Sequence, residues 1–288
     1  DGAGNQAQIT VYRLKDAYKT YRFTVDDCIR CFEDLNSHPE YTSIFDSPFL
    51  EVFHQAHQLY GARAHMNVFY ASPDSSFNLS MMTDRFREQF RQNADWLSFT
   101  FHARSEFPDA PYRNASYEEL RHDCQQVVRE IIRFAGPEVL RDSTTLHFGA
   151  CTIEGVRALR DEGYRSLCGY LAVNRRGETL VAYHLTPEQA RRAQTREGFW
   201  DEETGLLITR LDLVLNALEL TADRVEPFLD QLSERPHESG LIQMVIHEQY
   251  FYSDYPVYEP DYAQRILAMA RWLAGHGYHS VSHSDLMA

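Results

Sequence analysis

The chain has 288 residues, and its 28 Lys and Arg against 42 Asp and Glu give a net charge of −14 at pH 7. We expect no nucleic-acid partner, because binding a phosphate backbone needs a surplus of basic side chains. Hydrophobic residues make up 43% and charged residues 24% of the chain, a globular composition that excludes disorder, collagen and coiled coil. No apolar run approaches the roughly 20 residues of a membrane span, so a membrane partner is not expected either.

The cysteines indicate the compartment. There are five in a long chain, Cys28, Cys31, Cys124, Cys151 and Cys168. An odd number argues against a disulfide framework, and no signal peptide is visible. We therefore expect a cytoplasmic protein rather than a secreted one, although a chain that starts at Asp1 without Met can lack its natural N-terminus.

Short runs rich in β-branched and aromatic residues alternate with longer segments of helical period along the whole chain. The predicted strands are Tyr21–Val25, Ala64–Tyr70, Trp96–His102, Thr144–Phe148, Ser166–Val173, Leu206–Asp212, Leu241–His247 and Tyr278–Val281. The predicted helices are Asp27–Leu35, Pro48–Tyr60, Asp84–Asn93, Tyr117–Phe134, Ile153–Glu162, Pro187–Gln194, Ala222–Leu232 and Asp261–His276.

This alternation indicates an α/β protein with a mostly parallel sheet. Seven or eight such units predict a distorted (β/α)7-8 barrel, and no linker divides the chain, so we expect one domain over residues 1–288. The most polar stretch, near residues 175–205, is expected to form an excursion on the rim of the barrel.

Several predicted strands end in groups that can do chemistry. These are Asp26 and Asp27, His102, His147, Asp212, and His247 with Glu248. Barrel enzymes place their active sites at the carboxyl ends of the strands, so these side chains are candidates for one site.

Asp26 and Asp27 have two interpretations. They stand between a predicted strand and a predicted helix, where a carboxylate can simply cap the first helical amides. In the functional alternative the two carboxylates have different roles. One binds a divalent metal ion, and its neighbour accepts a proton from a water molecule bound to that metal.

The motifs resemble those of the polysaccharide deacetylase superfamily (NodB homology, carbohydrate esterase family 4). Phe23-Thr24-Val25-Asp26-Asp27 is similar to the family's Thr-Phe-Asp-Asp signature. Further similar segments follow in the family's order, at Gly61–Phe69, His102–Glu106, Leu146–Gly149, Ile246–Glu248 and Gly277–Val281. The resemblance covers nearly the whole chain and implies a NodB-type barrel.

The resemblance also implies a metal site. The family's ligands are the second Asp of the pair and both His of a His-x-x-x-His motif, which Asp27 and His102 match. Glu106 stands at the position of the second His, and His147 stands where the family has an Arg that orients the catalytic Asp. His147 is therefore a third ligand, a replacement for that Arg, or a core residue, and Glu106 is the alternative third ligand. We expect one divalent ion, with zinc first and other divalent ions as alternatives.

In this reading Asp26 is the general base, and His247 protonates the leaving amine or alcohol. Glu248 or Asp212 could hold the His247 imidazole in one tautomer, and the alternative for Asp212 is an ion pair with Arg210.

The leading hypothesis is thus a metal-dependent hydrolase that deacylates an N- or O-acylated carbohydrate or a similar small amide. A catalytically silent barrel that binds carbohydrate is the first alternative. The second is a glycosidase that uses two carboxylates, such as Asp26 with Asp212 or Glu248. The expected partner is a small-molecule or oligosaccharide substrate, and the oligomeric state is open.

Overall fold

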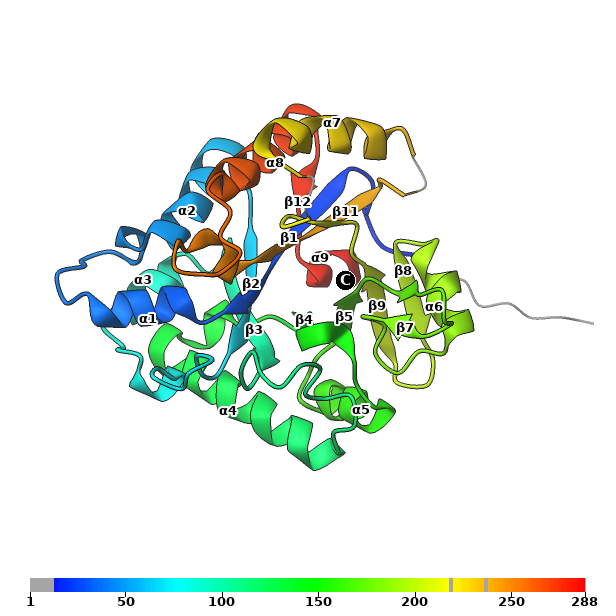
Figure 1. Ribbon diagram of the computed structural model, residues 1–288, viewed down its shortest axis with the longest axis horizontal. Coiled ribbons are helices and arrows are strands. Elements are labelled where there is room, and N and C mark those ends of the chain that lie inside the picture. Colours follow the sequence, from blue (N-terminus) through cyan, green and yellow to red (C-terminus); the bar gives the residue numbers. More distant parts are fainter. Residues whose placement is uncertain (1–12, 218–219, 236–237, 288) are drawn as a thin grey trace, which may run out of the picture.

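Seven parallel strands surround a common axis in chain order (Figure 1). The computed structural model describes residues 13–217, 220–235 and 238–287. The seven are β1 (Thr20–Cys28), β2 (Ala64–Phe69), β3 (Leu97–Ala103), β4 (Ser143–Thr144), β5 (Ser166–Gly169), β9 (Leu206–Arg210) and β11 (Leu241–His247). They divide into two sheets, which also include β10 (Leu213–Val214) and β8 (Gly198–Asp201) and have the orders β10-β11-β1-β2-β3 and β4-β5-β9-β8.

Two seams separate these sheets, so the described strands do not form one closed hydrogen-bonded ring. An isolated parallel bridge between Phe99 and Leu140 spans the seam between β3 and β4. At the other seam the chain leaves β9, continues as β10 (Leu213–Val214) and pairs with β11. The Asp212 N–H donates to Gln243 O there at 2.8 Å. The barrel is therefore nearly closed, and distorted as the sequence predicted.

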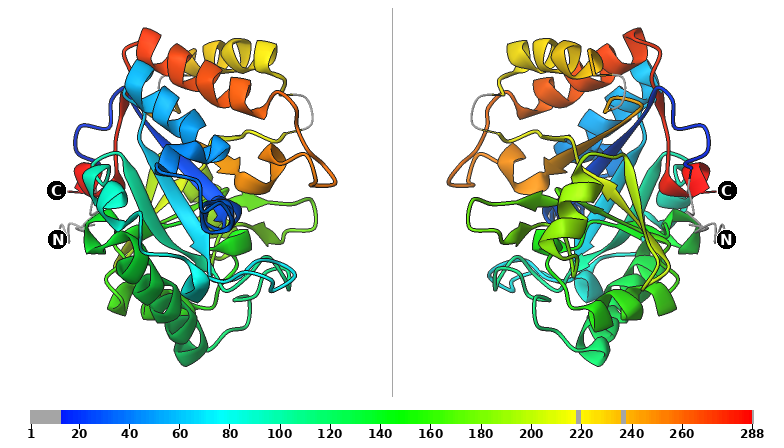
Figure 2. Two further views of the ribbon diagram at one scale, coloured as in Figure 1. Left: turned by 90° about the vertical axis from the view of Figure 1, so that its left-hand side faces the viewer. Right: turned by 90° about the vertical axis from the view of Figure 1, so that its right-hand side faces the viewer.

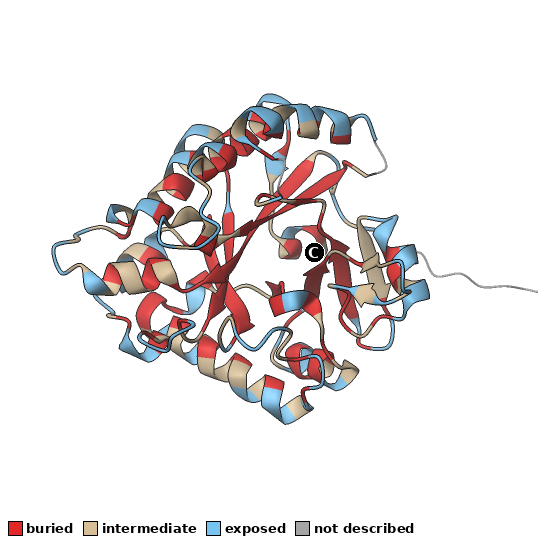
Figure 3. Cartoon of the chain, viewed as in Figure 1, coloured by how far each residue is buried: buried red, intermediate tan, exposed pale blue. Residues whose placement is uncertain are grey.

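Most of the helices cover the outside of the strands (Figure 1), and the last one lies at one end of the barrel (Figure 2). They are α1 (Arg30–Ser37), α2 (Pro48–Tyr60), α3 (Arg87–Gln92), α4 (Tyr117–Ala135), α5 (Ile153–Asp161), α6 (Pro187–Gln194), α7 (Ala222–Ser233), α8 (Tyr262–Gly275) and α9 (His283–Met287). Their buried faces and the strands carry most of the buried residues (Figure 3). Among the described residues no helix is long and apolar enough to cross a membrane.

Two predicted strands are shorter than expected, for local reasons. The predicted strand Thr144–Phe148 ends after Thr144, because Phe148 has a left-handed φ of 60° and lies in the 3-10 turn His147–Gly149. The predicted strand Ser166–Val173 breaks at Leu171, which has a φ of 56°. Its second part becomes β6 (Ala172–Val173), which forms a hairpin with β7 (Thr179–Leu180).

The predicted polar excursion contains β7, α6 and β8 (Gly198–Asp201). The predicted last strand is only β12 (His279–Ser280), which pairs with the start of β1. The last helix, α9, lies at one end of the barrel, and the loops that follow the strands lie at the other (Figure 2).

The interior of the barrel is polar. Alternate residues of a strand point to opposite faces, so Arg22, Thr24 and Asp26 of β1 share a face, as do His65 and Asn67 of β2. All five are buried. The polar residues nearest the carboxyl ends of the strands form the candidate site.

Candidate active site and metal centre

Asp26 and Asp27 are neighbours in the chain, yet both carboxylates face the interior. In a regular strand their side chains would point to opposite faces. Asp27 has a φ of 63°, and the pairing of β1 with β2 shifts register between Val25 and Cys28. Asp tolerates the left-handed region better than most residues, and such a bulge redirects a side chain. The bulge therefore brings both carboxylates to one site.

Asp27, His102 and His147 form a buried group that could hold a divalent metal ion. Their ligand atoms all lie within 4.8 Å of one another. Asp27 Oδ1 is 3.0 Å from His102 Nε2 and 3.2 Å from His147 Nδ1, and the two nitrogens are 3.2 Å apart. One carboxylate and two imidazoles are a ligand set typical of catalytic zinc sites.

The outer hydrogen bonds of the two imidazoles fix their tautomers. His102 Nδ1 donates to Thr145 O, and His147 Nε2 donates to Glu106 O at 2.9 Å. A carbonyl oxygen only accepts, so in the neutral rings His102 Nε2 and His147 Nδ1 carry lone pairs. Three acceptors then face one another, an arrangement that requires a cation between them. These three lone-pair atoms therefore fit a metal ion as ligands. The alternative is a proton shared among them.

The Asp27 carboxylate is fixed in position and negatively charged. Its Oδ2 atom accepts a hydrogen bond of 2.7 Å from Gln249 Nε2. Burial acts to raise the pKa of Asp27, but the adjacent His102 and His147 imidazoles, when they carry a proton between them, outweigh it and hold the pKa well below its usual range. Asp27 is thus an anion at neutral pH.

Asp26 lies beside this group and is oriented by amide and hydroxyl groups. Its Oδ1 atom accepts from Asn67 Nδ2 at 2.6 Å and from Thr24 Oγ1 at 3.1 Å. Asn67 is itself fixed, because its Oδ1 atom accepts from the Thr145 N–H at 3.0 Å. Burial raises the pKa of Asp26, although the charges of His102 and His247 oppose this. Asn67 and Thr24 orient Asp26 here, where the family motif has an Arg.

His247 approaches from the strand next to β1. It ends β11 and stands opposite Asp26 in the register of β1 and β11. Its Nδ1 atom lies 2.8 Å from Asn216 Oδ1, so Nδ1 donates and Nε2 is left for the pocket. The imidazole is positioned by an amide.

Three expectations from the sequence need correction. Glu248 does not orient His247: its carboxylate accepts from the Ile29, Arg30 and Cys31 N–H groups at 2.6–2.8 Å, which caps α1. Capping was one of the two interpretations of Asp26 and Asp27, and here Glu248 takes that role while both residues line the pocket.

Asp212 does not orient His247 either. It forms a buried ion pair with Arg210 at 2.6 Å and accepts from the Gln243 N–H, which was the structural alternative. Glu106 contributes its main-chain oxygen to His147, and its side chain lies outside the group of three ligand atoms.

Sequence reasoning missed Asn67, Asn216 and Gln249. Asn67 carried a signal, since Asn67 and His65 are polar residues at alternate positions of a strand whose other residues are apolar. Asn216 and Gln249 lie in a turn and a 3-10 helix, where no periodicity marks them.

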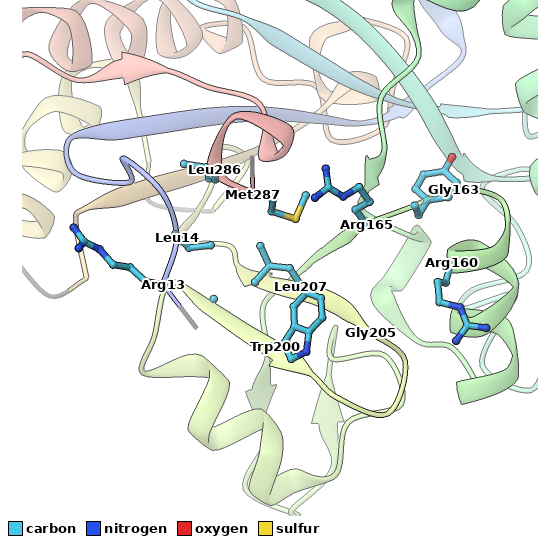
Figure 4. Close-up of a pocket in the computed structure, with 12 residues that line it drawn as sticks. Arg13, Leu14, Arg160, Gly163, Arg165, Trp200, Gly205, Leu207, Leu286 and Met287 are labelled. Atoms are coloured by element: carbon cyan, nitrogen blue, oxygen red, sulfur yellow. The ribbon is translucent and has the colours of Figure 1, made fainter. Parts of the chain in front are cut away.

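The site opens into a pocket of about 300 Å³ at the carboxyl ends of the strands. Asp26, Asp27, His102, His147 and His247 all line it. A larger cavity of about 520 Å³ lies at the amino ends of β5 and β9, between α9 and the strand residue Leu207 (Figure 4). Its lining has Trp200 and three arginines but no carboxylate or imidazole, so it offers no hydrolytic group.

Comparisons with known proteins support the fold. No family model and no curated protein matches the sequence. The T48 deacetylase, solved with its substrate, superposes with a TM-score of 0.50 and 14% identity over 94% of this chain and 91% of that one. A CE4 family pseudoenzyme from Bacillus anthracis superposes with a TM-score of 0.51 and 11% identity, over 96% of this chain and 68% of that one.

A third neighbour is the 4-alpha-glucanotransferase from Thermococcus litoralis, with a TM-score of 0.55 and 12% identity over 94% of this chain and 40% of that one. The NodB-type α/β barrel predicted from the motifs is thereby confirmed as the fold of this chain. At identities of 11–14%, the likeness is one of fold.

Proposed function

We propose that the protein is a metal-dependent hydrolase that removes the acyl group from an N- or O-acylated carbohydrate or a similar small amide. The observation that carries the proposal is the convergence of three acceptors, Asp27, His102 and His147, with Asp26 and His247 around one pocket. Zinc is the proposed ion, because one carboxylate and two imidazoles suit it.

A divalent ion held by Asp27, His102 and His147 would polarise the acyl carbonyl and make the attacking water more acidic. Asp26 would accept the proton of that water. Its second oxygen, Oδ2, has no hydrogen bond to Asn67 or Thr24, both of which bind Oδ1. Asn67 therefore fixes the base without occupying the oxygen that would take the proton.

His247 would supply the proton to the leaving group. The Asn216 amide oxygen holds its Nδ1–H, so the Nε2 atom faces the pocket and can donate once it is protonated. The register that places Asp26 opposite His247 puts the base and the acid on two adjacent strands.

Two observations support an acylated carbohydrate as substrate. The barrel shares its fold with a deacetylase and with a glucanotransferase, as those structures are described. The pocket is also lined by aromatic side chains, among them Phe148, Tyr170 and Tyr250, which can pack against sugar rings.

The experiment measures metal content and turnover in the same preparations, on a panel of N- and O-acetylated sugars and small amides. The proposal expects one divalent ion per chain and hydrolysis that stops when the ion is chelated. No turnover across the panel with zinc, cobalt, nickel or manganese bound would favour the silent binding barrel, the class to which the Bacillus anthracis neighbour belongs by its description.

The glycosidase alternative needs a second carboxylate beside Asp26, and the two candidates for it are not available. Asp212 and Glu248 are engaged with Arg210 and with the start of α1, and neither lines the pocket. A pair such as Asp26 with Asp212 therefore cannot flank a glycosidic bond in this pocket.

A further inference from the structure

The proposed active-site pocket carries an excess of negative charge. Four carboxylates line it, those of Asp26, Asp27, Glu106 and Asp109, and its described lining contains no Lys or Arg. One divalent cation would neutralise two of the four negative charges. The remaining potential would attract a cationic substrate and repel an anionic one.

Glu106 and Asp109 contribute this charge without serving the proposed chemistry. They belong to the loop after β3, which His147 holds through its hydrogen bond to the Glu106 main-chain oxygen. Within the described part of the chain neither carboxylate lies in an ion pair of 4.0 Å or less, and the nearby Arg30 is paired with Asp254 at 2.6 Å.

A buried acceptor in the same pocket lacks a donor. Gln249 is 9% exposed and lines the pocket, and its Oε1 atom accepts no hydrogen bond. The amide cannot turn over without losing the bond from its Nε2 atom to Asp27. The Gln249 Oε1 atom is therefore available to accept a hydrogen bond from an N–H or O–H group of a ligand.

Aromatic rings complete the surroundings of a cation. Tyr250 and Tyr255 line the pocket with their ring centroids 5.2 Å apart, and Phe107 and Phe148 line it while remaining 59% and 46% exposed. Aromatic faces together with carboxylates are the groups that bind alkylammonium ions in proteins.

We propose that the substrate is an acylated amine that carries a second, protonated amino group, which Glu106 and Asp109 bind at the mouth of the pocket while the acyl group lies at Asp27, His102 and His147. This inference rests on the proposed function for the position of the acyl group. An acylated diamine and an amino sugar with a free neighbouring amine share this chemistry.

The test compares three probes of similar length, N-(5-aminopentyl)acetamide, N-hexylacetamide and 6-acetamidohexanoate, which are cationic, neutral and anionic. Their Kd values for the zinc-loaded protein are measured by calorimetry, and kcat/KM is measured wherever turnover occurs. We expect the Kd of the cationic probe to be lower than that of the neutral probe by about tenfold or more, and the anionic probe to bind most weakly. This preference should be smaller at high salt.

In the double variant Glu106→Gln with Asp109→Asn the difference between the probes should collapse. The matched control is Asp95→Asn, which removes an exposed carboxylate before the amino end of β3, away from the pocket, and should keep the preference. Chito-oligosaccharides with and without free amines then distinguish an amino-sugar substrate from a diamine.

Equal affinities for the three probes, absence of binding by all of them, or a preference that survives in the double variant would overturn the inference. The proposed function fails separately. Hydrolysis of all three probes with equal kcat/KM would refute charge selection but leave the hydrolase, whereas selective binding of the cation without turnover on any acylated compound would refute the hydrolase and leave the charge selection.

Discussion

Asp26 and Asp27 are adjacent in the chain, and the left-handed φ of 63° at Asp27 turns both carboxylates into one pocket. The bulge that this residue creates is what separates their surroundings. Asp26 accepts from Asn67 and Thr24, whereas Asp27 faces two imidazoles. Two carboxylates in such different surroundings can take different roles, a base and a ligand.

The first prediction concerns the base. Asp26→Asn keeps an Oδ1 acceptor for Asn67 and Thr24, so the variant should fold and retain its metal. It cannot accept a proton, and kcat should fall by about 10²-fold or more. Turnover and metal content are measured on the same preparation. Full activity at full metal content would remove Asp26 from the mechanism.

The second prediction concerns the acid. His247→Ala should lower kcat by about 10²-fold on an alkyl amide, whose leaving amine needs a proton. On an acetate ester of a nitrophenol, whose leaving group needs no proton, the loss should be much smaller. Asn216→Ala should show the same pattern to a lesser degree, because it frees the imidazole to turn. Equal losses on both substrates would contradict the role of His247 as acid.

The third prediction concerns the metal. His102→Ala removes one of the three converging acceptors and should leave a folded protein with well under one ion per chain. The control is His65→Ala, which deletes another buried imidazole of the barrel, one whose hydrogen bonds within the described residues go to Ser98 and Ser143. It should keep the ion. Elemental analysis of both variants decides, and metal retained in full by His102→Ala would refute the site.

The fourth prediction concerns stability. Glu248→Gln places an amide where the carboxylate accepts three backbone N–H groups, and should cost about 2 kcal/mol of unfolding free energy. The control Asp254→Asn breaks the exposed ion pair with Arg30 on the same helix and should cost about 1 kcal/mol or less. Thermal or urea unfolding measures both, with metal content unchanged. An effect of Glu248→Gln no larger than that of Asp254→Asn would show that the cap is not stabilising.

Much of this arrangement could be predicted from the sequence, because strand ends mark one edge of a parallel barrel. That rule placed Asp26, Asp27, His102, His147 and His247 as candidates for one site, and the structure brings all five into one pocket. The same rule also selected Asp212 and Glu248, because it does not reveal which side of the sheet a strand-end residue faces or which other group it meets.

The remaining contacts depend on register. Asn67 reaches Asp26 because the register of β1 and β2, with Val25 opposite Met66, sets the next two residues side by side, and the bulge that follows redirects Asp27. Asn216 reaches His247 from a turn 31 residues away. Neither the bulge nor the turn geometry follows from hydrophobic period. The tautomers of His102 and His147 likewise depend on the carbonyls of Thr145 and Glu106, which the sequence does not place.

The most direct test of the account is anomalous diffraction at the zinc edge from crystals grown with stoichiometric zinc. The account predicts one peak about 2.0–2.2 Å from an Asp27 carboxylate oxygen, His102 Nε2 and His147 Nδ1. No peak at that position with zinc in excess, or a peak held by other residues, would mean that a proton satisfies the three acceptors and that the protein is not a metal-dependent hydrolase.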